Sequence, residues 1–99
     1  MLDFYSIKDD QPTPSYPEKL DLKFVGDLDD ITFGNLQNKG IIDRKLDYYS
    51  DFRLSRSVIQ LIRQTISDNK LESDTDVKKI VLLLDLADKY HSGLIAYGD

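Results

Sequence analysis

The sequence predicts a single small α+β domain, in which a mostly antiparallel sheet of three or four short strands carries two main helices on one face. Two C-terminal segments, 55–68 and 74–91, repeat apolar residues at the spacing of a helix. Short aromatic and β-branched runs lie before and after the helical segments. The chain has 99 residues, enough for a core without disulfides or metals, so we expect one domain over residues 1–99.

The N-terminal segments predict two strands joined by a loop. Residues 2–7 mix aromatic, β-branched and polar side chains, as a short strand or an extended arm does. The three prolines of the chain fall within residues 9–17, which predicts an ordered loop. Residues 20–24 alternate apolar and polar side chains, which indicates a half-buried strand that closes at Gly26.

The middle of the chain predicts a short helix and a third strand. Asp29 or Asp30 is a candidate N-cap for a helix to about Asn38, and Gly40 suits a left-handed stop. Residues 48–54 are rich in aromatic side chains and favour a strand. One face of this strand is predicted to carry Tyr48, Phe52 and Leu54.

The helix over 55–68 has a start signal and an apolar stripe. Ser55 is a good N-cap, and Leu54 and Ile59 are placed to form a hydrophobic staple around it. The expected core stripe consists of Val58, Leu61, Ile62, Thr65 and Ile66. The residues expected to face solvent are Arg56, Gln60, Arg63, Gln64 and Ser67.

The helix over 74–91 is preceded by residues 73–76, which match a capping box beginning at Ser73. Its expected core stripe consists of Val77, Ile80, Val81, Leu84 and Ala87, widened by Leu83, Leu86 and Tyr90. Ser92 and Gly93 predict a left-handed C-cap, and residues 94–97 predict a last strand.

The net charge of −5 is carried by the first third of the chain. Residues 1–30 hold eight acids against three lysines, whereas residues 31–99 hold ten acids and ten bases. Such an acidic block attracts basic partners and repels phosphate backbones and anionic lipid. We therefore expect neither nucleic-acid nor membrane binding, and no apolar run is long enough to span a bilayer.

The sequence lacks the residue patterns that metal sites and catalytic sites require. Asp27 and Asp29 stand at the first and third places of a calcium loop, but Thr32 replaces its glycine, so helix capping is the better interpretation. His91 is the one histidine and is expected to interact with the carbonyls at a helix end. The chain has no cysteine and no nucleophile or phosphate-loop motif. We expect no enzyme, cofactor or metal.

Binding to another protein, one of basic character, is the function that these features favour. The chain has six tyrosines, a residue type enriched at interfaces. The predicted partner-binding residues are Asp9, Asp10, Tyr16, Asp27, Asp29 and Asp30. The size, acidity and lack of cysteine are similar to those of immunity proteins of bacterial toxin systems. This compositional similarity implies an inhibitor that occupies the cationic groove of its partner.

Two alternatives remain open at this point. One is a homodimer formed through a sheet edge, either that of the strand over residues 94–97 or another edge. The other is a non-catalytic domain with a small-ligand pocket between sheet and helices. The absence of cysteine and of a signal peptide predicts a cytoplasmic protein.

Overall fold

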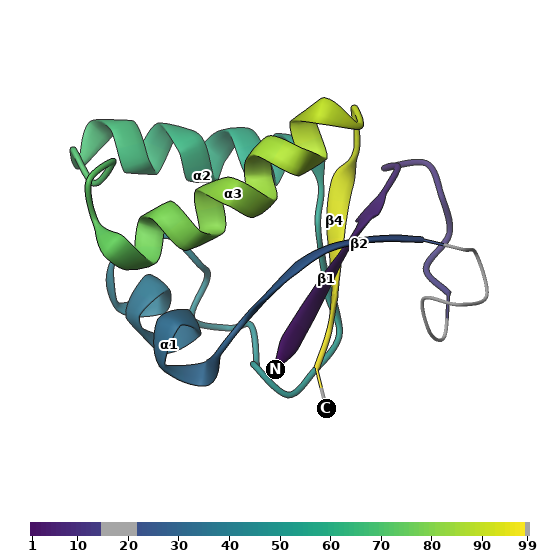
Figure 1. The fold of residues 1–99 in the computed structure, drawn as a ribbon, viewed down its shortest axis with the longest axis horizontal. Helices are drawn as coiled ribbons and strands as arrows, with labels where there is room; N and C mark the ends of the chain where they lie inside the picture. The colour runs from purple at the N-terminus through teal and green to yellow at the C-terminus, as the bar shows by residue number, and fades with distance from the viewer. Residues whose placement is uncertain (15–21, 99) are drawn as a thin grey trace.

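Four strands form one antiparallel sheet in the computed structural model, which describes residues 1–14 and 22–98 (Figure 1). The strands are β1 (Leu2–Ile7), β2 (Lys23–Leu28), β3 (Phe52–Leu54) and β4 (Gly93–Tyr97). Their order is β2-β1-β4-β3, with every neighbouring pair antiparallel. The predicted α+β class and antiparallel sheet are confirmed.

Strand β2 extends beyond the predicted stop at Gly26. The prediction of a strand over 20–24 was wrong at its end, because Gly26 lies within β2, opposite Phe4 of β1. Gly26 has a φ of 153°, and a Cβ on it would lie 2.5 Å from Cδ2 of Leu83. Glycine is therefore needed where helix and strand come close together, and it does not end the strand. The beginning of the predicted strand falls outside the described residues.

Strand β3 is shorter than the predicted segment 48–54. It includes only residues 52–54, because residues 47–50 form a turn. In this turn the Ser50 amide donates to the carbonyl oxygen of Asp47 at 3.1 Å. The Tyr49 amide donates to the side-chain carboxylate of Asp47 at 2.9 Å. Aspartate side chains that accept backbone amides compete with strand pairing in this way.

Three helices cover one face of the sheet: α1 (Asp30–Asn38), α2 (Arg56–Asp68) and α3 (Thr75–Lys89) (Figure 1). The core lies between this layer and the sheet. It includes Leu2, Phe4, Leu28, Phe33, Leu36, Leu54, Ile59, Ile62, Ile66, Val77, Ile80, Leu83, Leu84, Ala87, Leu94 and Ala96. The predicted caps Asp29 and Ser55 are confirmed, since their side chains accept from the amides of Thr32 and Val58.

The apolar stripe of α2 differs from the prediction. Ile59, Ile62 and Ile66 face the core, whereas Val58 is 37% and Leu61 is 66% exposed. Both sets have helical spacing. The core-facing set is the one that begins with Ile59, which is buried with Leu54 in the same cluster.

Both ends of α3 differ from the prediction. Its N-cap is Asp74, not Ser73, and the Asp74 carboxylate accepts from the amides of Asp76 and Val77. At its C-terminus the left-handed residue is His91, with a φ of 51°, while Gly93 belongs to β4. Within the helix, Val81 is only half-buried, and Leu82 is 65% exposed.

The opposite face of the sheet is partly covered by the first residues of the predicted loop 9–17 (Figure 1). Arg53 of β3 donates to the carbonyl oxygens of Gln11 at 2.6 Å and Lys8 at 2.9 Å. The Tyr97 hydroxyl donates to the carbonyl oxygen of Pro14 at 3.1 Å. Ile95, which is 1% exposed, is buried on this side. Residues 15–17 of the loop lie outside the described part of the chain.

Candidate functional site

The structure divides the predicted partner-binding acids between two ends of the sheet. Asp27 pairs with Asp3 near the start of β1, and Asp29 and Asp30 follow directly. Asp9 and Asp10 come after the last residue of β1. The six residues of this strand separate the two groups by about 20 Å. Tyr16 lies outside the described residues.

Asp9 contacts the N-terminus of α2. Its two carboxylate oxygens each lie 3.2 Å from the backbone nitrogen of Arg56, the first residue of the helix. A carboxylate in this place accepts from an amide that has no partner within the helix, and it complements the helix dipole. Asp9 therefore has a structural role in holding the loop, and Asp10 is exposed beside it.

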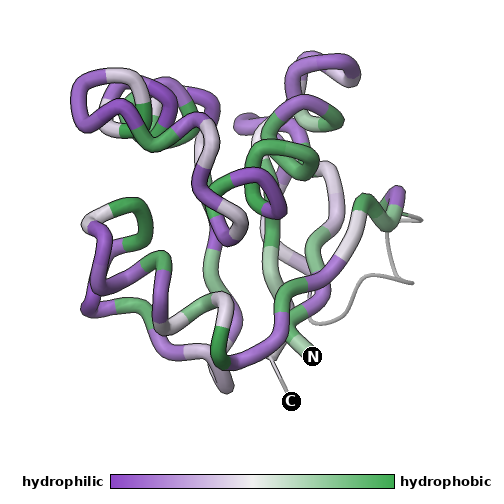
Figure 2. Tube along the Cα trace, turned by 60° about the vertical axis from the view of Figure 1, so that its left-hand side comes forward, coloured by the Kyte–Doolittle hydropathy of each residue, from purple (hydrophilic) through white to green (hydrophobic). Residues whose placement is uncertain are grey.

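Five aspartates lie on two segments, one where β2 ends and α1 begins and one where the chain enters β3. We call this region the acidic end; it consists of Asp27, Asp29, Asp30, Asp47, Asp51 and Tyr49. The Tyr48 hydroxyl joins its two segments by donating to the carbonyl oxygen of Leu28 at 3.2 Å. The C-terminal segment joins them too, since the Gly98 amide donates to the Asp51 carboxylate at 3.1 Å. Hydrophilic residues follow one another along this end, beside both termini (Figure 2).

Three of the five carboxylates of the acidic end are held in place by backbone amides. The amide of Thr32 donates to Asp29 at 2.7 Å. This hydrogen bond lowers the pKa of Asp29, with smaller contributions from the Thr32 side chain and the Lys79 ammonium. Asp47 and Asp51 each accept one amide as well. Asp27, Asp30, Asp47 and Asp51 are exposed, so their charges face solvent.

Ion pairs within the described residues involve other acids. Lys39 lies 2.6 Å from Asp74 and 3.2 Å from Asp76. Arg63 lies 2.8 Å from Asp85 and 2.6 Å from Asp88. Four acids of the C-terminal half thus have cationic neighbours, whereas no ion pair of the described residues includes a carboxylate of the acidic end.

An exposed tyrosine lies in the chain between two of these aspartates, Asp47 and Asp51. Tyr49 is 65% exposed, and its ring packs edge-on against Tyr48, with centroids 5.0 Å apart. Tyr48 in turn packs against Phe33 of the core at 5.6 Å. Burial raises the pKa of the Tyr48 hydroxyl, and the negative charge of Asp30 raises it further. The exposed ring of Tyr49 therefore packs on Tyr48, whose own position is fixed by its contact with the core.

The sequence reasoning missed Asp47 and Asp51 as members of this site. The sequence does contain a signal for them: Asp47 and Asp51 flank the tyrosine pair, in a segment that is too polar for a strand. Of the other tyrosines, Tyr5 is half-buried and packs edge-on against Phe24 and Tyr97 on the far face of the sheet.

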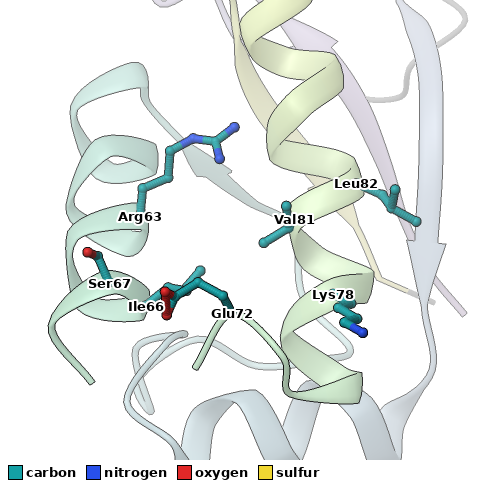
Figure 3. A pocket seen from close by; sticks show the side chains of 7 residues that line it. All are labelled: Arg63, Ile66, Ser67, Glu72, Lys78, Val81 and Leu82. Carbon is teal, nitrogen blue, oxygen red and sulfur yellow. The ribbon is translucent and has the colours of Figure 1, made fainter. Parts of the chain in front are cut away.

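A groove of about 500 Å³ lies between α2 and α3 (Figure 3). Ile66 and Val81 form its apolar floor, and Arg63 reaches across it toward α3. Among the described residues, no group of three or more His, Cys, Asp or Glu side chains is placed to hold a metal ion. No helix in that part of the chain has the length and apolarity needed to cross a membrane.

The chain matches no protein-family model, and neither a curated protein nor a solved structure is significantly similar to it.

Proposed function

We propose that this protein is a protein-interaction module that binds a basic partner protein through its acidic end. The observation that carries the proposal is the exposed Tyr49 at the acidic end, whose five carboxylates take part in no ion pair of the described residues. An inhibitor of the immunity type, which occupies a cationic groove in the cytoplasm, is the specific form that we favour.

The two kinds of residue contribute differently to such binding. Exposed carboxylates of one sign accelerate the encounter with a basic protein by about tenfold to a thousandfold, and salt weakens this effect. Tyrosine supplies contact area at low entropic cost and is enriched among the residues that dominate binding energy. Since hydrogen bonds already fix Asp29, Asp47 and Asp51 and the supporting Tyr48, these residues need little ordering on binding.

The homodimer through residues 94–97 loses its basis, because β4 lies between β1 and β3 and both its edges are paired. A strand with two paired neighbours has no free edge to offer a second chain.

The test compares two variants of equal net charge. Asp27→Lys/Asp30→Lys reverses charge at the acidic end, whereas Asp68→Lys/Glu72→Lys reverses two exposed charges elsewhere. The protein is immobilised, lysate of its source is applied at low salt, and the partner eluted by a salt gradient is identified and purified. Its association rate with each variant is then measured.

We expect the acidic-end variant to slow association at least tenfold and to flatten its salt dependence. The control variant is expected to retain association within about threefold. Equal effects of the two variants would show that net charge matters and the acidic end does not. Recovery of no basic partner at low salt would contradict the proposed function.

A further inference from the structure

The outer edge of β2 has no strand beside it in the described part of the chain. β2 is the first strand in the order β2-β1-β4-β3 and pairs with β1 alone. Alternate residues of such an edge strand point their amides and carbonyls away from the sheet, as free donors and acceptors. No turn, loop or cap hydrogen bond between described backbone groups uses residues 23–27. With six residues against three in β3, β2 is the edge that can accept a further strand.

Successive residues at the end of β2 face opposite sides of the sheet. Gly26 faces α3, since a Cβ on it would lie 2.5 Å from Cδ2 of Leu83. Leu28 faces the same side and is buried in the core. Asp27, which lies between them, therefore faces the other side of the sheet and is exposed. A strand added to β2 meets an apolar layer on one face and a carboxylate on the other.

A hollow of about 360 Å³ lies between β2 and α3, on the helix side of this edge. Leu82 points away from α2 and, with Leu83, lines the hollow from α3 (Figure 3). Val25 and Leu28 line it from β2, and Gly26 between them contributes no side chain. A glycine in an edge strand leaves room for a side chain of the neighbouring strand. The hollow is therefore suited to an apolar side chain that enters beside Gly26.

We propose that an extended segment of the basic partner adds to β2 as a further strand, with basic and apolar side chains alternating along it. The inference rests on the proposed function and describes how that partner binds. Basic side chains lie on the same face as Asp27, and an apolar side chain enters the hollow beside Gly26. In this mode of recognition, backbone hydrogen bonds provide affinity and the alternating side chains provide specificity.

The charges at this end of β2 favour a basic segment. Asp27 is exposed within the strand, and Asp29 and Asp30 follow directly after it. No ion pair of the described residues includes any of the three. Lys79 is the one basic side chain that lines the hollow, and its ammonium lies 3.4 Å from the Thr32 hydroxyl on the helix side. A basic side chain opposite Asp27 lies on the other face of the sheet from Lys79 and pairs with the carboxylate across the strands.

The test uses a synthetic peptide with blocked ends in which arginine and valine alternate. A control peptide has the same composition, with its arginines and valines in separate blocks. Hydrogen exchange of the backbone amides, resolved by NMR on the whole chain, detects the new strand. We expect the alternating peptide at saturation to slow exchange of the outward-facing β2 amides at least about tenfold. The block peptide, of equal charge, should bind at least about tenfold more weakly.

Two charge reversals test the position of the segment. Asp27→Lys should weaken binding of the alternating peptide at least about tenfold. Asp68→Lys is the matched control, because Asp68 is exposed at the end of α2, and it should change binding by less than about threefold. Equal weakening in the two variants, equal binding of the two peptides, or no binding at millimolar peptide would overturn the inference. Circular dichroism checks that both variants fold.

The exchange measurement separates this inference from its alternatives. Slow exchange of β2 amides in the free protein that becomes faster on dilution would show that a second copy occupies the edge, and would overturn the inference. A basic partner that needs the acidic end but leaves β2 exchange unchanged would overturn this inference and keep the proposed function. Failure to recover any basic partner would overturn the proposed function, whatever the peptides do.

Discussion

The Tyr48 hydroxyl donates a hydrogen bond to the carbonyl oxygen of Leu28 at 3.2 Å, joining the turn before β3 to the end of β2. These two residues are twenty positions apart in the sequence. The contact therefore holds together two segments that both contribute aspartates to the acidic end. It also places Tyr48 as the support on which the exposed ring of Tyr49 packs.

Removing this hydroxyl should lower stability. We expect Tyr48→Phe to reduce the free energy of unfolding by about 1 kcal/mol, because a part-buried carbonyl loses its donor. Urea unfolding measures the change. Tyr49→Phe is the control and should stay within about 0.5 kcal/mol, since its ring is exposed. Equal effects of the two variants would show that the hydrogen bond to Leu28 contributes little.

Acid should destabilise the protein through two helix caps. The Thr32 amide lowers the pKa of Asp29 from 3.8, and Lys39 lowers that of Asp74 from the same value. A carboxyl with a lowered pKa in the folded state stabilises fully above its unfolded pKa, and this contribution is lost as pH falls through the folded pKa. We therefore expect urea midpoints to be level near neutral pH and to fall below about pH 4.

The double variant Asp29→Asn/Asp74→Asn checks that origin. Asparagine also caps helices, so the fold should be kept, but neither side chain can be protonated. Its urea midpoint should fall less steeply with acid than that of the wild type. If the urea midpoints of the double variant and the wild type fall equally with pH, other carboxylates cause the acid sensitivity.

The helix caps were predictable because they depend on neighbours in the sequence. Asp29 and Ser55 each lie three positions before the amide they cap, and this spacing is visible in the chain. Which face of α2 packs against the core was harder to predict from the sequence. Val58–Leu61 and Ile59–Ile62 have the same spacing, so only the position of the sheet decides which pair is buried.

The candidate site could be predicted in its chemistry but not in its extent. Asp9 and Asp27 belong to one acidic block in the sequence, yet β1 separates them by its whole length. Asp51 is remote from Asp27 in the sequence, and the sheet brings the ends of β2 and β4 to the same side. Strand order is a long-range property that a local pattern does not contain.

The ends of α2 and α3 offer a stabilising substitution. Lys70 and His91 follow the C-caps and have φ values of 53° and 51°. Side chains disfavour this left-handed region by about 1–2 kcal/mol, whereas glycine adopts it freely. We expect His91→Gly to raise the free energy of unfolding by about 0.5–1 kcal/mol, after the greater freedom of glycine in the unfolded chain is included. His91→Ala should bring no gain, and a gain equal to that of glycine would show that backbone conformation is not the cause.

Two glycines should respond oppositely to the same change. Gly34 lies within α1 and has no neighbour within 4 Å of an added Cβ, so Gly34→Ala should stabilise by about 1 kcal/mol through helix propensity. Gly93 begins β4, where a Cβ would lie 2.5 Å from the carbonyl oxygen of Leu54 and 2.9 Å from the Asp9 carboxylate. Backbone cannot move aside as a flexible side chain can. We expect Gly93→Ala to destabilise by about 1–3 kcal/mol in urea unfolding. A neutral Gly93→Ala would mean that β3 and β4 separate at this point at little cost, and that the sheet does not depend on this close approach.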